Sequence, residues 1–195
     1  TRIWLDEYNG QGNDDDKAFG IVVDQAENIY VTGYSTGVNS GWDLTTRKYN
    51  SAGDTLWTSR YNDTTVNSDD KAFGIVVDSD GNSFVTGYTT ADTSGRTDYL
   101  TLRINPSGET IWKSTYNGIG NYQDTALAIC LAKHSEHVYV TGGSSRDTGA
   151  GKLDIMNLRY DIATGELVDS SRYNGGSNRD DVGNCIVSDT GGNVF

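Results

Sequence analysis

The chain has 195 residues, 35% of them hydrophobic, and a formal net charge of −12. The acidic balance and the lack of a basic stripe argue against a nucleic-acid partner, and no apolar run is long enough to insert into a membrane. Glycine is abundant, with 24 residues, whereas proline occurs once. This composition is typical of many short strands joined by tight turns, and no window has a helical period, so we expect an all-β protein.

The first element in chain order is residues 1–9, which we expect to form a lone outer strand. The reason is that a tryptophan followed four residues later by a tyrosine recurs along the chain. The pairs are Trp4 and Tyr8, Trp57 and Tyr61, and Trp112 and Tyr116. Each later pair closes a longer unit, so the first pair represents only the last strand of such a unit.

The units that follow are nearly literal repeats. The sequence Asp-Lys-Ala-Phe-Gly-Ile-Val-Val-Asp occurs at 16–24 and at 70–78, a shift of 54 residues. In the second copy, strands are expected at residues 72–77, 83–88, 99–104 and 110–116, separated by turn residues. Four antiparallel strands at this period are typical of the blades of a β-propeller. We therefore expect about three and a half blades, at residues 15–62, 69–117 and 123–174, with a further blade beginning at 180–195.

The inner strand of each blade predicts how blades stack. A four-stranded sheet cannot bury both faces alone, so stacking it on its neighbours must do so. We expect Phe73 and Ile75, with the tryptophan of each fourth strand, to fill the gaps between blades. Ala72 and Gly74 suit a crowded strand close to the propeller axis.

These residues also carry a family resemblance. The pattern Asp-x-Ala-x-Gly-Ile-x-Val-Asp-x-x-Gly-Asn-x-Tyr/Phe-Val-Thr-Gly-Tyr resembles the SBBP-type bacterial β-propeller repeat, named for seven-bladed propellers. The third copy departs from it, with Ala128 in place of the glycine and Ala132 in place of the second aspartate. The resemblance implies an extracellular or cell-surface protein of bacteria or archaea, in a family mostly without assigned activity.

The two ends of the sequence both fall inside a blade. Open blade edges are templates for pairing with another chain. Two readings follow. The chain is a fragment whose other blades lie in a longer protein, or it is a unit that associates with itself, as a ring of copies or as a head-to-tail fibre. We favour the fragment.

An aspartate stands at the same position before the first strand of each copy, as Asp16, Asp70, Asp124 and Asp181. A ring of carboxylates on one face of the propeller is a candidate calcium site. The alternative, which we favour, is that each aspartate accepts hydrogen bonds from backbone N–H groups at the entrance to its strand. We therefore assign no metal or other cofactor.

The loops between second and third strands differ in length, and loops on a rigid scaffold commonly carry binding. Tyr34, Trp42 and Tyr88 lie in or beside them, so these residues are the candidate surface for a carbohydrate or protein partner. Neutral variation of the loops is the alternative interpretation.

No set of catalytic residues can be assembled from the sequence. We therefore expect a non-catalytic extracellular scaffold with a structural, adhesive or protein-binding role. The alternative is a portion of a propeller enzyme, a hydrolase or lyase that acts on polysaccharide. The near identity of the first two copies favours the scaffold, because catalytic sites break a repeat with unique residues.

Overall fold

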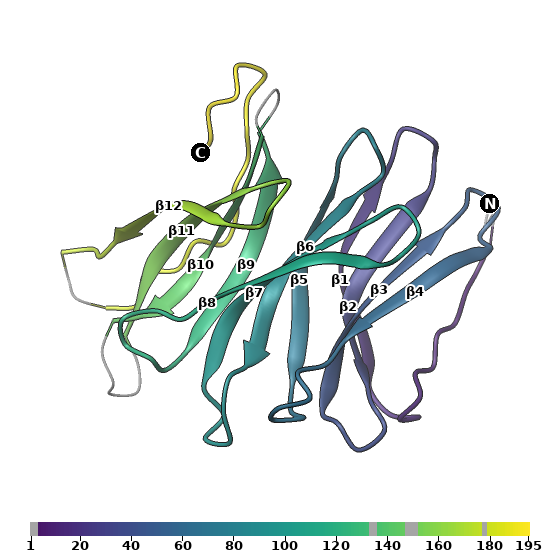
Figure 1. The fold of residues 1–195 in the computed structure, drawn as a ribbon, viewed down its shortest axis with the longest axis horizontal. Coiled ribbons are helices and arrows are strands. Elements are labelled where there is room, and N and C mark those ends of the chain that lie inside the picture. The colour runs from purple at the N-terminus through teal and green to yellow at the C-terminus, as the bar shows by residue number, and fades with distance from the viewer. Residues whose placement is uncertain (1–3, 133–135, 147–151, 177–178) are drawn as a thin grey trace.

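The computed structural model describes residues 4–132, 136–146, 152–176 and 179–195 (Figure 1). All its regular elements are strands, and they form three antiparallel sheets in which each strand pairs with the next in the chain. The first blade comprises β1 (Asp16–Val23), β2 (Ile29–Thr36), β3 (Trp42–Tyr49) and β4 (Thr55–Tyr61). The second comprises β5 (Asp70–Val77), β6 (Ser83–Thr90), β7 (Thr97–Ile104) and β8 (Thr110–Tyr116). The third comprises β9 (Asp124–Leu131), β10 (His137–Ser145), β11 (Leu153–Asp161) and β12 (Leu167–Tyr173).

The predicted propeller architecture is confirmed, in an open form. The three blades stand side by side in chain order, and the row does not close on itself (Figure 1). The first strands β1, β5 and β9 contact one another in sequence, so they form the inner edge of the row. The strands of the second blade begin up to two residues earlier than expected, because Asp70 and Thr97 pair with Thr89 and Thr90.

Each inner strand contains a β-bulge at the same place, and the bulge explains the Val-Thr-Gly motif. In β5, Ala72 pairs with Gly87 and Gly74 with Thr86, which leaves Phe73 without a partner. The bulge brings the backbone of β5 close to β6, and a Cβ on Gly87 would lie 1.8 Å from the carbonyl oxygen of Lys71. Only glycine fits at that position, so the motif is a consequence of the bulge.

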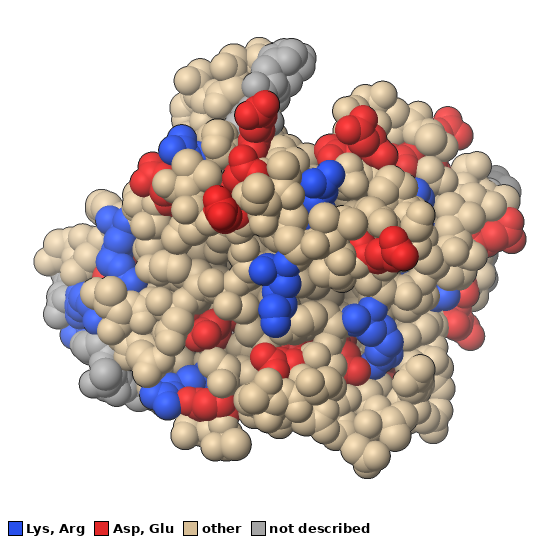
Figure 2. All heavy atoms as spheres, in the orientation of Figure 1, with Lys and Arg blue, Asp and Glu red and all other residues tan. Residues whose placement is uncertain are grey.

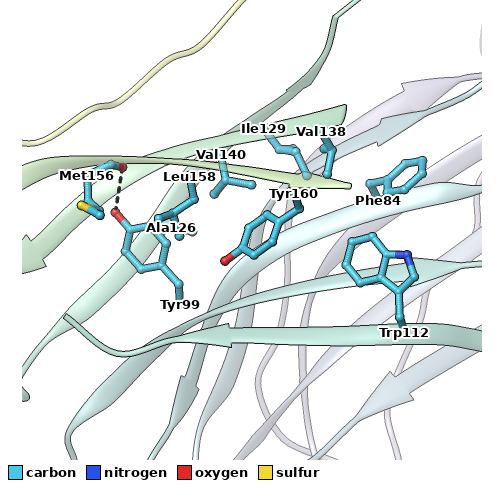
Figure 3. Packing of buried hydrophobic residues seen from close by; sticks show 10 residues of the cluster. All are labelled: Phe84, Tyr99, Trp112, Ala126, Ile129, Val138, Val140, Met156, Leu158 and Tyr160. Atoms are coloured by element: carbon cyan, nitrogen blue, oxygen red, sulfur yellow. Dashed lines mark hydrogen bonds between the residues drawn. The ribbon is translucent and has the colours of Figure 1, made fainter. Parts of the chain in front are cut away.

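The hydrophobic core lies between blades, as predicted from the repeat. Figure 3 shows the junction of the second and third blades, where Phe84 and Trp112 face the buried side chains of β9, β10 and β11. The hydroxyl of Tyr99 donates a hydrogen bond across this junction to the carbonyl oxygen of Met156, at 3.3 Å. Ile75 fills the other junction and is 8% exposed. Phe73 was expected beside it. Phe73 does lie at this junction, with its ring centroid 5.2 Å from that of Phe19 in the first blade, but outside the buried cluster that contains Ile75.

Tryptophans on the fourth strands link each blade to the next. The indole N–H of Trp57 donates to the carbonyl oxygen of Pro106 at 2.9 Å, and that of Trp112 donates to the carbonyl oxygen of Ile162 at 2.9 Å. The turn beneath Trp57 contains Gly108, whose φ is +92° and whose missing Cβ leaves room for the indole. The tight turn and the indole contact both require glycine there.

The expected half-blades at the two ends differ from the prediction. Residues 4–8, which we call the N-terminal segment, are not in a strand, although Trp4 packs on Gly53 as Trp57 packs on Gly108. The segment has the position of a fourth strand, and no third strand lies beside it among the described residues. Residues 1–3 of the expected strand lie outside the described residues. At the other end, residues 184–188 form a single bridge, from Ser188 to Val194, instead of a strand.

Candidate functional site

Five aromatic side chains from the first and second blades form one continuous cluster. The ring centroids lie 4.9 Å apart for Trp42 and Tyr34, 5.9 Å for Tyr34 and Phe19, 5.2 Å for Phe19 and Phe73, and 6.0 Å for Phe73 and Tyr88. We call these five residues the aromatic cluster. Tyr34 is buried, while Phe19 is 50% exposed. The cluster therefore has a buried part, which holds it in place, and an exposed part, which is accessible from solvent.

The ammonium of Lys71 lies over three of these rings. Its Nζ is 3.6 Å from the centroid of Trp42, 5.0 Å from that of Tyr34 and 5.7 Å from that of Tyr88. These are cation–π contacts, and they are strongest where the cation is partly desolvated. Burial lowers the pKa of Lys71, which shows that the surrounding groups do not fully replace water around the ammonium.

The structure brings together all three residues predicted as a binding surface, namely Tyr34, Trp42 and Tyr88. Sequence reasoning missed Lys71, Phe19 and Phe73. The two phenylalanines are the unpaired residues of the bulges in β1 and β5. The sequence carried no clear signal for them, and the structure shows why: Ala72 and Ile75 are both buried although they are three residues apart. A regular strand repeats its faces every two residues, so this spacing indicates an inserted residue.

The four aspartates considered as metal ligands each bind backbone instead. An oxygen of each carboxylate accepts a hydrogen bond from an N–H of the preceding connection. The pairs are Gly10 with Asp16 at 2.9 Å, Asp63 with Asp70 at 2.8 Å, Gly118 with Asp124 at 2.7 Å and Gly175 with Asp181 at 2.6 Å. Across the described ranges, no three His, Cys, Asp or Glu side chains gather in a way that could hold a metal ion. The geometry matches the backbone-binding alternative.

A second set of equivalent aspartates shows where the repeat is broken. Asp43 pairs with Arg60 at 2.8 Å and Asp154 with Arg172 at 3.1 Å. The second blade has Asp98 at the same position, and strand pairing places Thr115 where the other blades have arginine. Burial, with a contribution from the nearby charge of Asp124, raises the pKa of Asp98 to about 6.

Asp70 is a further carboxyl group with a raised pKa. It is fully buried, and this burial raises its pKa to about 6 although Thr89 and the N–H of Asp63 donate hydrogen bonds to it. Raised carboxyl pKa values are found at catalytic sites and also in structural networks. The hydrogen bonds that Asp70 accepts join β5 to β6 and to the preceding connection, so they belong to a structural network.

One face of the first blade has no blade packed on it. Ile21 of β1 is 70% exposed, while the equivalent Ile75 and Ile129 of the other blades are 8% and 7% exposed. A hollow of about 290 Å³ lies on this open face, between the N-terminal segment and β2 and β3. Arg47 and Tyr49 line it from β3. Charged side chains of both signs are scattered over the surface shown in Figure 2, without a continuous basic patch.

One comparison with known proteins, the scan against family models, matches part of the chain. The model of the SBBP family, described as a beta-propeller repeat, matches residues 7–39 and 57–92. The resemblance deduced from the repeated pattern is therefore confirmed over these two segments. No curated protein matches the chain. Among solved structures, the chain is similar to a protein of unknown function from Bacteroides caccae, at 13% identity and a TM-score of 0.28, over 80% of this chain and 67% of that one.

Proposed function

We propose that this chain, which contains β-propeller repeats of the SBBP family, is a non-catalytic scaffold of the extracellular space or cell surface that associates through its open blade faces. One observation carries the proposal: Ile21 is 70% exposed on a face that is covered in both other blades. An apolar face of this kind marks an interaction site. Its occupant is a blade of the same repeat. A second copy of the chain and a further segment of a longer chain are the two sources, and self-association is the one that the purified chain tests directly.

The internal junctions support this choice of occupant. They show what the open face accepts, because Ile75 and Ile129 occupy the same position and pack on a preceding blade. A Cβ on Gly20 would lie 3.0 Å from a methyl group of Ile75, so β1 and β5 fit closely. In a second copy the matching face of the third blade carries the segment after β12, where Ser188 donates a hydrogen bond to the carbonyl oxygen of Leu131. The contact would therefore be head-to-tail, between that end of one copy and the open face of the other.

The test is the mass of the purified chain in solution, measured by light scattering after size exclusion. We expect particles of two or more chains, and we expect Ile21→Asp to give monomers without loss of the β-sheet circular dichroism signal. Val38→Asp is the matched control, because Val38 is 61% exposed on a loop. A folded wild-type monomer, or equal dissociation by both variants, would contradict self-association. Dissolution of the particles by EDTA would show that a metal ion holds them together.

The alternative function is part of an enzyme, and its candidate acid is Asp98, which has no arginine at the position that Arg60 and Arg172 occupy in the other blades and whose pKa burial raises to about 6. A carboxylic acid with such a pKa suits general acid catalysis, as in an enzyme that cleaves polysaccharide. Cleavage of polysaccharide that is lost in Asp98→Asn, with folding retained, would support this alternative over the scaffold.

A further inference from the structure

The aromatic cluster is not a requirement of blade packing. It exists at the junction of the first and second blades, where Lys71 and Tyr88 face Tyr34 and Trp42. At the next junction the equivalent positions hold different residues. Thr125 replaces the lysine, Leu127 the phenylalanine and Gly143 the tyrosine of the second blade. That junction is nevertheless well packed, with Ile129 only 7% exposed. The cluster is therefore an addition to the common design.

The ammonium of Lys71 lacks an anionic partner. In the described part of the chain no carboxylate lies within ion-pair distance of its Nζ, whereas Lys17 lies 3.9 Å from Asp15. The aromatic rings contact the ammonium through their faces, and an ammonium also has three N–H donors. Asp69 acts on the charge of Lys71 from further away, and it accepts a hydrogen bond from the backbone N–H of Trp42. A carboxylate brought by a ligand would complete the coordination of Lys71.

We propose that the aromatic cluster and Lys71 form a binding site for a carboxylated sugar, a uronate residue of an oligosaccharide. The ligand carboxylate accepts hydrogen bonds from Lys71, and the apolar face of the sugar ring stacks on Phe19, which is 50% exposed. Exposed Lys17, 5.8 Å from the Tyr34 ring, adds a second positive charge at the edge. This inference goes beyond the proposed scaffold, because it gives the chain a ligand as well as a partner.

An acidic peptide is the less favoured ligand. One common way for an extended peptide to bind is to add a strand to an exposed sheet edge, which needs a regular row of backbone donors and acceptors. The bulges at Phe19 and Phe73 interrupt that row in β1 and β5. A compact ligand that makes side-chain contacts suits the site better. Because the chain has a net charge of −12, a short oligosaccharide should bind better than a long polyanion.

The experiment is a titration of the full chain with trigalacturonate, with trigalactose as the uncharged counterpart. Trp42 is the reporter, because a ligand at Lys71 changes the surroundings of its indole ring. We expect trigalacturonate to change the tryptophan fluorescence and trigalactose to bind at least about tenfold more weakly. In the variant Trp42→Phe the fluorescence change should disappear. Calorimetry of the same variant should still detect most of the heat of binding.

The variants separate a binding site from a structural cluster. Lys71→Met should weaken trigalacturonate binding about tenfold or more, and Lys71→Arg should keep it within a few-fold. Phe19→Ala should weaken binding several-fold, and Leu127→Ala is the matched control in the third blade. Equal binding by Lys71→Met, equal binding of both sugars, or no binding at all would overturn the proposal. So would tighter binding of a triglutamate peptide. The mass of each variant in solution tests self-association separately.

Discussion

Two junctions of this molecule have the same geometry and different chemistry. The N-terminal segment meets the first blade as the first blade meets the second, with a tryptophan over a turn glycine. At the outer half of the N-terminal junction, Arg47 pairs with Asp6 at 2.5 Å and lies 4.3 Å from the ring centroid of Tyr8. The equivalent positions at the next junction are Leu102 and Ser59. Both partners of the ion pair have changed together.

The comparison shows what each part of a junction contributes. The tryptophan and its glycine fix the distance between units, so they recur unchanged. The outer residues can vary, provided that the residues facing each other across the junction change together. An arginine placed among aliphatic residues would be a partly buried charge without a partner. Mutations can test each half of this comparison.

The largest effect is expected at the inner half, where the filled and open faces differ most. Ile75→Asp places a carboxylate in a closed core, and we expect it to lower the free energy of unfolding by about 4 kcal/mol. Ile21→Asp, at the equivalent exposed position, should change it by less than about 0.5 kcal/mol. Urea denaturation followed by circular dichroism measures both values. Similar losses in the two variants would mean that the open face is covered within one chain.

A smaller effect is expected from the ion pair. Arg47→Leu leaves Asp6 with only the hydrogen bond from the Tyr49 hydroxyl, and we expect a loss of about 1 kcal/mol, because the pair is partly exposed. Asp6→Ser should cost a similar amount, and the double variant should recover most of both losses by recreating the aliphatic junction. A double-mutant cycle from urea denaturation gives the coupling energy. Strictly additive losses would show that the two substitutions are not matched.

The smallest effect concerns Asp98, which lacks the arginine that Asp43 and Asp154 have. Its pKa is raised to about 6 in the folded chain, so protonation favours folding. Its contribution to stability therefore rises as pH falls from about 7 to about 4, the range between the folded and unfolded pKa values. Thr115→Arg should lower that pKa, add about 1 kcal/mol at pH 7 and flatten this dependence. Thermal unfolding at pH 7 and pH 5 measures it, with Thr115→Gln as the uncharged control. An unchanged pH dependence would contradict the pairing.

Much of the architecture could be predicted from the sequence, because the repeat puts turn residues and apolar residues at fixed offsets. A prediction that assumes strict alternation of buried and exposed residues along a strand cannot find the bulge. The bulge leaves Phe73 without a partner residue in β6. The candidate site was predicted in part. Its tyrosines and Trp42 were identified from the loops, but Lys71 joins them across two blades, and the contact depends on how closely β1 and β5 approach. Strands were expected at both ends of the sequence, but residues 4–8 and 184–188 do not form them. Residues with a high strand propensity form a strand only when a neighbouring strand supplies hydrogen-bond partners.

The tryptophan contacts also give the chain a direction. Trp57 bonds to a residue 49 positions later and Trp112 to one 50 positions later, so each indole reaches forward into a unit not yet synthesised when it leaves the ribosome. Ile75, in contrast, packs backward on a unit already made. During synthesis a new blade can thus pack on the preceding blade as soon as it is made. The hydrogen bond of its own tryptophan can form only after the following blade has been made. Each junction can therefore close only after the later of its two blades has been synthesised.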